Sequence, residues 1–499
     1  MPYQPQLFEI VHPDLADHDA FAKRVDDLLV KQSPYFARLW GYYRNQMLPP
    51  PALTGVTESQ RPYRQAQEWG LPPRITGTYY SHDNQNQPLE RFVRKEVVIE
   101  NDIAWRVDTI VDFLFGRRVE VESLATDPDR KQMIEELLRC VIHHNGDSGF
   151  FQKLALLGAV YGFVDVVAKF EASDDSETCV VTQTCLSAPI QTLQKMSKHV
   201  RWEIAEPPRA LAIVDEADPQ RVLAHAQVWR QRRAVPASPN LPPRSRTFFN
   251  RLLGVAGTNA TDPNHMTVVE LVSPTMWHRY EDEVLVASGR NSLCRLPMVH
   301  IQNVALPFDY SGASDVEPLI PLQDELNTRL SDRAYRITMQ SSKMYLGKGI
   351  ANFNDFPVSP GRMWMTDNLD AQVIEFGGDS ACPSEDAHIS DLREAMDKLS
   401  GVSPIAAGAI KGRIGRLTSA AALRVTFLAL LARTTRKHLT YGPAIAELCE
   451  ISLAWLDHAG LFKTTPEERR VKINWPSPIP DNDLLRLDEV SPEVAETSP

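Results

Sequence analysis

The stretch Asp315–Leu346 reads DVEPLIPLQDELNTRLSDRAYRITMQSSKMYL and sets the pattern for the middle of the chain. Its leucines recur three or four residues apart, at Leu319, Leu322, Leu326 and Leu330. This spacing places them on one side of a helix. Opposite charges stand four residues apart on the flanks, as Glu325 with Arg329 and Asp332 with Arg336. The pattern predicts a long helix with one apolar face and charged sides.

A short segment and a second helix follow this stretch. Residues Gly347–Gly378 are punctuated by glycine, proline, phenylalanine and tryptophan, and AQVIEF near their end predicts a strand. Ser384 is a favourable helix N-cap, acids fill the first turn, and Gly401 is a favourable stop. The apolar residues between them keep helical spacing: Ile389, Leu392, Met396 and Leu399. We therefore expect two helices that bracket a small subdomain.

Glycines and cations mark the next segment, Ala409–Thr418, which reads AIKGRIGRLT. A nucleotide-binding loop of the GxxxxGK[ST] type is excluded, because arginine and isoleucine follow Gly412 where that loop requires lysine and a hydroxyl residue. A helix should run from Ser419 to Tyr441, and Gly442-Pro443 should break it before a further helix.

The first part of the chain contains separate helical and strand patterns. Residues Ile99–Glu122 carry an amphipathic helix, a stop at Gly116 and then alternating Val and Glu, which predicts a strand. Asp127-Pro128 should open a second helix as N-cap and first helical residue. Strand patterns dominate from 163 to 305. We expect an α+β protein.

Composition limits the function classes. The chain has 499 residues and a formal net charge of −11, which argues against a protein that coats nucleic acid, because such binding needs a broad cationic face. No apolar run approaches the ~20 residues of a membrane-spanning helix. The N-terminus lacks the basic start and apolar run of a secretory signal, so we expect a protein made and used inside a cell.

Metal and cofactor sites are not expected. The six cysteines form no CxxC pair and are interpreted as free buried thiols. His143-His144-Asn145 could belong to a metal nuclease, but no other histidine or carboxylate cluster has ligand spacing, and a helix C-terminus favours histidines through its dipole. No HExxH, GxSxG or GxGxxG motif in the required context is present, so we expect neither a cofactor nor an enzyme.

Three segments, in this order, resemble the portal protein of tailed bacteriophages. They are WRVDTIVDFLFGRRVEVE at 105–122, DVEPLIPLQDELNTRLSDRA at 315–334 and KLSGVSPIAAGAIKGRIGRLTSAAALRV at 398–425. The resemblance covers about residues 95–475. It implies a homo-oligomeric ring, typically a dodecamer, at one capsid vertex. Double-stranded DNA enters through such a ring during packaging by terminase and leaves through it during ejection.

The resemblance also implies a portal fold with an α/β wing, a two-helix stem, a small α/β clip, a tunnel loop, a long wing helix and a short crown. The implied ranges are an N-terminal helix and extended arm (1–90), the wing with its β-rich second half (91–310), stem helix 1 (311–346), the clip (347–383), stem helix 2 (384–402), the tunnel loop (403–418), the long wing helix and a C-terminal helix towards the crown (419–475), and an acidic flexible tail (476–499).

Site residues follow from these parts. The tunnel loop would contact the DNA backbone through Lys411, Arg413 and Arg416, with Gly408, Gly412 and Gly415 giving it freedom to move. The stem and subunit contacts would be Leu326, Leu330, Leu392 and Met396. The clip would dock partners through Phe353, Phe356, Trp364 and Met365. The alternatives are that the cations only solvate a connector and that the clip aromatics form its own core.

The implied partners are the terminase large subunit, an adaptor or neck protein, and the major capsid and scaffolding proteins. The implied location is the virion, after assembly in the host cytoplasm. One alternative is another structural or adaptor protein of the head–tail connector, and a second is a DNA-processing enzyme.

Overall fold

The computed structural model contains helices and sheets in two compact units, in agreement with the α+β class expected from the sequence. Unit 1 comprises Met1–Arg44, Ile103–Pro318 and Ser400–Pro499, and unit 2 comprises Asn45–Asp102 and Leu319–Leu399. The structure describes residues 32–48, 64–77, 79–82, 88–91, 95–171, 190–215, 217–218, 221–232, 265–281, 284–341, 344–348, 369–376, 382–406 and 427–478. Each unit is therefore built from segments far apart in the sequence.

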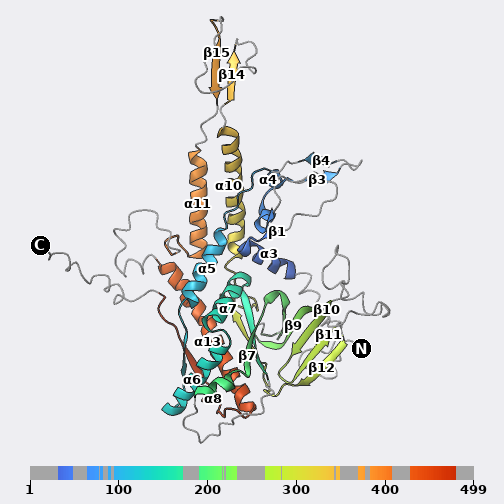
Figure 1. Cartoon of the computed structure of the whole chain (residues 1–499), viewed down its shortest axis with the longest axis vertical. Helices are drawn as coiled ribbons and strands as arrows, with labels where there is room; N and C mark the ends of the chain where they lie inside the picture. The colour runs from blue at the N-terminus through green and yellow to red at the C-terminus, as the bar shows by residue number, and fades with distance from the viewer. Residues whose placement is uncertain are drawn as a thin grey trace, which may run out of the picture. The chain divides into compact units, whose positions relative to one another are not determined.

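Unit 1 contains two larger antiparallel sheets (Figure 1). One has the strand order β12-β11-β10-β9-β8, and the other has the order β13-β6-β7. The strands are β6 (Phe163–Phe170), β7 (Val200–Ala205), β8 (Ala210–Val214), β9 (Val222–Arg232), β10 (His265–Val272), β11 (Met276–Glu281), β12 (Val284–Arg290) and β13 (Met298–Gln302). Strand β6 is central and buried over its first six residues. A separate pair joins β5 (Glu120–Ser123) to β16 (Val471–Asn474).

Unit 1 also contains the helices α3 (Ser33–Arg44), α5 (Asp102–Phe115), α6 (Pro128–His144), α7 (Asp147–Tyr161), α8 (Ile190–Ser197) and α13 (Leu428–His458). Of these, α7 and α13 pack against the β13-β6-β7 sheet. The predicted cap at Asp127 is confirmed, since its side chain accepts a hydrogen bond from the Asp129 amide at 3.1 Å. None of the described helices has the length and apolar character needed to span a membrane.

Helix α13 is continuous, so the predicted break at Gly442-Pro443 was wrong. Tyr441, Ile445 and Leu448 are fully or almost fully buried on one side of it. Burial of such side chains contributes roughly 1.5–3 kcal/mol each. Together they offset the roughly 3 kcal/mol that an internal proline costs a helix.

The end of α7 lies directly against the loop that precedes unit 2. Gly162 ends the helix with φ 93°, and a Cβ atom added to it would come within 2.3 Å of the Gly312 carbonyl oxygen. A Cβ atom added to Gly312 would likewise come within 2.4 Å of the Gly162 carbonyl oxygen. The two glycines therefore let two backbone segments touch.

Unit 2 is built around two helices joined by a β-hairpin: α10 (Ile320–Ser341), β14 (Met344–Lys348), β15 (Gln372–Phe376) and α11 (Pro383–Ser400). The helices lie side by side (Figure 1). Shorter elements complete it: β1 (Met47–Leu48), β2 (Arg64–Gln65), η3 (Ala66–Gly70), α4 (Pro73–Thr76), β3 (Tyr79–His82) and β4 (Pro88–Arg91).

The helix boundaries differ from those predicted. The range 311–346 is not one helix: it contains the 3-10 turn η5 (Glu317–Leu319), then α10, and then the start of β14. The residues before η5 bond to the end of α7, and the residues after α10 pair in the hairpin, so neither end is helical. Helix α11 begins at Pro383, one residue before the predicted cap, which suits proline as a first helical residue. The predicted stop at Gly401 is confirmed by its φ of 70°.

The described cysteines are free, as expected, but they are not all buried. Cys449 is buried, whereas Cys294 is exposed, which corrects the interpretation that all six are buried thiols.

Candidate functional site

The helix pair α10–α11 carries the four residues predicted for a stem. Leu326 and Met396 are fully buried, Leu392 is nearly so, and Leu330 is half-buried. The chain itself covers three of the four, so Leu330 alone among them offers substantial apolar surface to a neighbour. The proposed subunit contact through these residues stays a prediction, and the burial of Leu326, Leu392 and Met396 shows that these three are core residues of the chain.

Ion pairs join the two helices along one flank. Arg333 contacts Asp386 at 2.5 Å, and Arg336 contacts Glu385. The expected pair of Asp332 with Arg336 is not formed; Asp332 instead contacts Arg74 of α4, because that guanidinium binds both of its carboxylate oxygens. The expected pair of Glu325 with Arg329 is confirmed at 2.7 Å. Of the two expected pairs, Glu325 with Arg329 thus forms within α10, whereas Asp332 and Arg336 each bind another element.

A row of buried polar side chains holds α10 to the extended segment that precedes α5. Gln323, Asn327 and Ser331 stand four residues apart on one face of the helix and are 0–1% exposed. They accept hydrogen bonds from the backbone amides of Asp102 (3.1 Å), Glu100 (3.1 Å) and Val98 (3.0 Å). The segment before α5 is not paired in a sheet, so these three side chains accept the hydrogen bonds that a neighbouring strand would otherwise accept. We did not predict this row, although its four-residue spacing is visible in the sequence.

Helix α11 has an excess of acids, although Glu385, Asp386 and Glu394 form ion pairs with Arg336, Arg333 and Lys398. The helix carries five acids, Glu385, Asp386, Asp391, Glu394 and Asp397, against two basic residues, Arg393 and Lys398. Asp386, Asp391 and Glu394 are exposed. An acidic surface repels the phosphates of nucleic acid instead of binding them.

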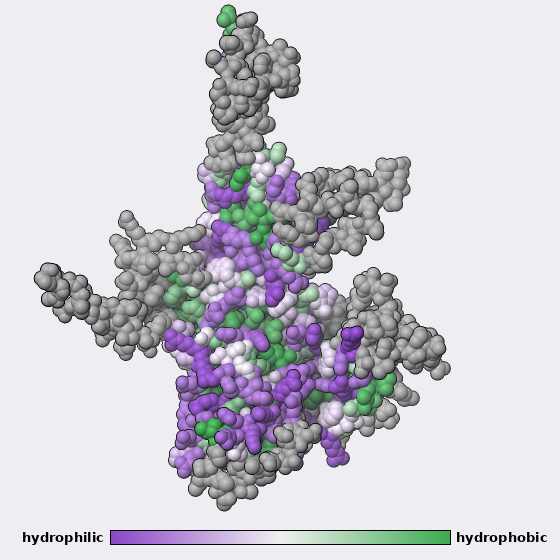
Figure 2. Space-filling model, viewed as in Figure 1, coloured by the Kyte–Doolittle hydropathy of each residue, from purple (hydrophilic) through white to green (hydrophobic). Residues whose placement is uncertain are grey.

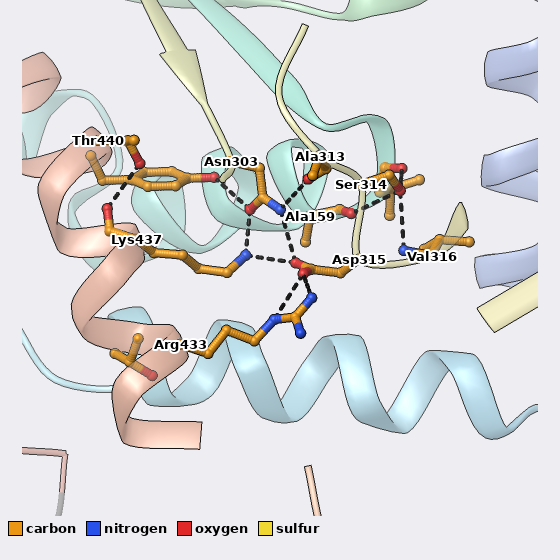
Figure 3. A network of polar contacts seen from close by, with 12 residues as sticks. Ala159, Asn303, Ala313, Ser314, Asp315, Val316, Arg433, Lys437 and Thr440 are labelled. Carbon is orange, nitrogen blue, oxygen red and sulfur yellow. Dashed lines mark hydrogen bonds and ion pairs between the residues drawn. The ribbon is translucent and has the colours of Figure 1, made fainter. Parts of the chain in front are cut away.

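A buried charge network ties α13 to the loop that leads towards α10 (Figure 3). Asp315 is 1% exposed and accepts hydrogen bonds from Lys437 at 2.6 Å and from the Arg433 Nε at 3.1 Å. The amide of Asn303 donates to Asp315 at 3.0 Å, and its oxygen accepts from Lys437. Two cations thus share one carboxylate inside unit 1.

The electrostatics of Asp315 follow from this geometry. Burial alone raises the pKa of the carboxyl group, but the combined attraction and hydrogen bonds of Lys437 and Arg433 outweigh burial, so the pKa lies below its usual value. The backbone of Asp315 is also fixed, since its amide donates to the Ala159 carbonyl at 2.8 Å. Ser314 next to it donates to the Val160 carbonyl at 2.6 Å. The network holds the loop against α7 and α13 at once.

A second buried carboxylate, Asp165 on β6, is bound by two histidine rings and a tyrosine hydroxyl. Its oxygens lie 2.7 Å from His300 Nδ1 and 3.2 Å from His225 Nε2, and Tyr310 donates to it at 2.8 Å. Burial alone raises the pKa of Asp165, but the bonds from the two histidines hold it below its usual value. The cluster links β6, β9, β13 and the loop after β13. Because Asp165 is 0% exposed, it presents no carboxylate oxygen to solvent.

The remaining predicted site residues lie outside the described residues. These are the tunnel-loop positions Gly408, Lys411, Gly412, Arg413, Gly415 and Arg416 and the clip positions Phe353, Phe356, Trp364 and Met365. Their roles stay predictions. The described elements that lead towards them are β14 and β15 for the clip, and α11 and α13 for the loop.

The histidine pair at the end of α6 is exposed. His143 and His144 occupy its last turn, where the helix dipole favours them. They line a shallow pocket of about 480 Å³ together with Arg118, Arg139 and Lys198. Within the part of the chain that the structure describes, no group of three or more His, Cys, Asp or Glu could hold a metal ion.

No protein-family model matches the chain, and no curated protein matches it. The sequence pattern and the geometry of the described elements therefore carry the functional proposal.

Proposed function

We propose that this chain is the subunit of a portal-type ring, through which a DNA duplex passes during genome packaging and ejection. The helix–hairpin–helix of unit 2 is the observation that carries the proposal. At 1.5 Å per residue, α10 and α11 are about 33 Å and 27 Å long, which suits the wall of a channel. The hairpin β14–β15 between them corresponds to the clip, where terminase and later an adaptor or neck protein would dock.

Charge supports a channel through which DNA slides. Each phosphate that a protein neutralises strengthens attachment through counterion release, so a binding wall would slow a moving duplex. Helix α11 has an excess of acids, and the whole chain has a net charge of −11. A ring of such helices would bind DNA weakly along its length.

Local cations would then make the few DNA contacts. The segment with Lys411, Arg413 and Arg416 lies in the chain between α11 and α13. In a ring, copies of these cations at one height would contact phosphates without reading sequence. This role continues the prediction made from the sequence.

Particle mass and negative-stain microscopy of the purified full chain test the proposal. We expect one class of ring with a central hole and a constant subunit number. An adaptor protein of the same vertex would also form a ring, but would not support packaging when mixed with terminase and DNA. A monomer that cleaves DNA or hydrolyses nucleotide would contradict the proposal and favour an enzyme.

A further inference from the structure

A short loop after β13 presents apolar side chains to solvent. Phe308 is 88% exposed and Leu306 is 37% exposed, whereas hydrophilic residues cover most of the described surface seen in Figure 2. Phe308 also has a φ of 61°, a left-handed conformation that is strained for a bulky residue. Such strain persists where the surroundings enforce it, and it is concentrated at functional positions. We call residues 305–309 the knob.

The knob is held firmly at its base. Gln302 donates to the Asp309 carbonyl at 2.8 Å, and the Asp309 side chain accepts from the Ser311 amide at 3.0 Å. Tyr310, the next residue, donates to buried Asp165 at 2.8 Å. The Asp165 cluster thus fixes the loop from below. A rigid apolar projection binds a partner with little loss of conformational entropy.

Helix α13 carries a second exposed apolar surface. Its first turns have two stripes, each with 4-3-4 spacing. The inner stripe is buried in the chain and consists of Leu430, Thr434, Lys437 and Tyr441. The outer stripe is exposed and consists of Leu428, Ala432, Thr435 and Leu439, with Leu428 and Leu439 at 66% and 72% exposure. A solvent-facing helix side is normally polar, and no residue that the structure describes covers this stripe.

The two surfaces face different ways in one chain. Lys437, on the inner side of α13, donates hydrogen bonds to Asn303 and Asp315 at the base of the knob loop (Figure 3). The outer stripe lies on the opposite side of the same helix. A chain therefore cannot cover its own stripe with its own knob, but the knob of a second copy can reach it.

Charges beside the two surfaces are complementary. Asp309 is exposed next to Phe308, and Arg436 is exposed next to the outer stripe. Within the described part of the chain, neither has an ion-pair partner. Contact between two different patches of identical chains is head-to-tail, and it generates a ring when the rotation closes.

We propose that the knob of one subunit packs on the outer stripe of α13 of its neighbour, with Asp309 opposite Arg436. This interface rests on the proposed ring and names the surfaces that close it. Phe308 and Leu306 would cover Ala432 and Leu439, and the contact would repeat around the ring.

Disulfide cross-linking tests the contact directly. In the full chain, the double variant Phe308→Cys/Leu439→Cys should give a ladder of covalent multimers on oxidation. Each single variant keeps the native cysteines and should give no ladder. A ladder from Phe308→Cys/Val286→Cys, which probes the exposed apolar residue Val286 on β12, would overturn the assignment of the stripe.

Ring stability provides an independent readout. Phe308→Asp should raise the concentration needed for ring assembly on the order of tenfold, as loss of a central interface aromatic does. Ile190→Asp, at a 58% exposed position of α8, is the matched control and should not. The single reversals Asp309→Arg and Arg436→Asp should weaken assembly, and the double reversal should restore it.

The outcomes separate this interface from the proposed function. A wild-type ring that Phe308→Asp leaves unchanged overturns the knob contact and leaves the channel proposal standing. A wild-type chain that remains monomeric overturns both.

Discussion

The inner faces of α10 and α13 bury polar groups in opposite ways. Helix α10 uses neutral side chains, Gln323, Asn327 and Ser331, to bond backbone amides. Helix α13 uses two charged side chains that share Asp315. Removing a neutral partner leaves a buried amide unsatisfied, whereas removing a charged partner leaves a buried ion uncompensated, which costs more. We therefore expect a substitution in the charged network of α13 to reduce stability more than a substitution in the neutral row of α10.

Loss of Asp315 should have the largest effect on stability. Asp315→Ala leaves the buried Lys437 and the partly buried Arg433 without their carboxylate, and breaking a buried pair typically costs ~3–5 kcal/mol. Asp391→Ala, at an exposed aspartate of α11, is the control and should change stability by less than ~0.5 kcal/mol. Urea unfolding of both variants measures the difference. Equal stabilities would show that the network does not lock α13.

Acid should act through the same carboxylate. The pKa of Asp315 is lower in the folded chain than in the unfolded chain, so its contribution is present above the unfolded value of about 3.9 and is lost as pH falls through the folded value. The wild type should therefore lose stability below about pH 4 more steeply than Asp315→Asn. Unfolding curves at a series of pH values test this, and parallel pH profiles would contradict it.

The α10 row should respond more weakly. Ser331→Ala removes the acceptor of the Val98 amide and should cost ~1–3 kcal/mol. Ser390→Ala is the matched exposed change on α11 and should be neutral or slightly stabilising, because alanine favours helices. Thermal unfolding compares them. A cost for Ser331→Ala as large as that for Asp315→Ala would remove the contrast between the two helices.

The smallest effect on stability should come from the chain between α11 and α13. Replacing Lys411, Arg413 and Arg416 with Gln should leave folding and ring assembly almost unchanged, because the tunnel loop predicted from the sequence would hold these cations in solvent, where charges contribute about 0–1 kcal/mol. The same variant should package or retain less DNA, since it loses phosphate contacts around the ring. A packaging assay with terminase measures this. Full packaging at the wild-type rate would contradict the predicted DNA contact and leave the segment as an ordinary connector between two helices.

Local patterns predicted much of the fold. Leucine spacing located α10 and α11, and the cap at Asp127 and the stop at Gly401 are short-range signals that the structure confirms. Long-range partners could not be predicted. The sequence does not show that Lys437 meets Asp315, or that Arg336 binds Glu385 instead of Asp332, since these contacts depend on packing. The continuation of α13 past Pro443 likewise depends on packing.

Electron cryomicroscopy of the assembled particle would show whether the chain forms a channel. We expect a closed ring in which α10 and α11 of every subunit surround an axial channel wide enough for a DNA duplex. A particle without an axial channel, or a ring with these helices on its outer surface, would contradict it.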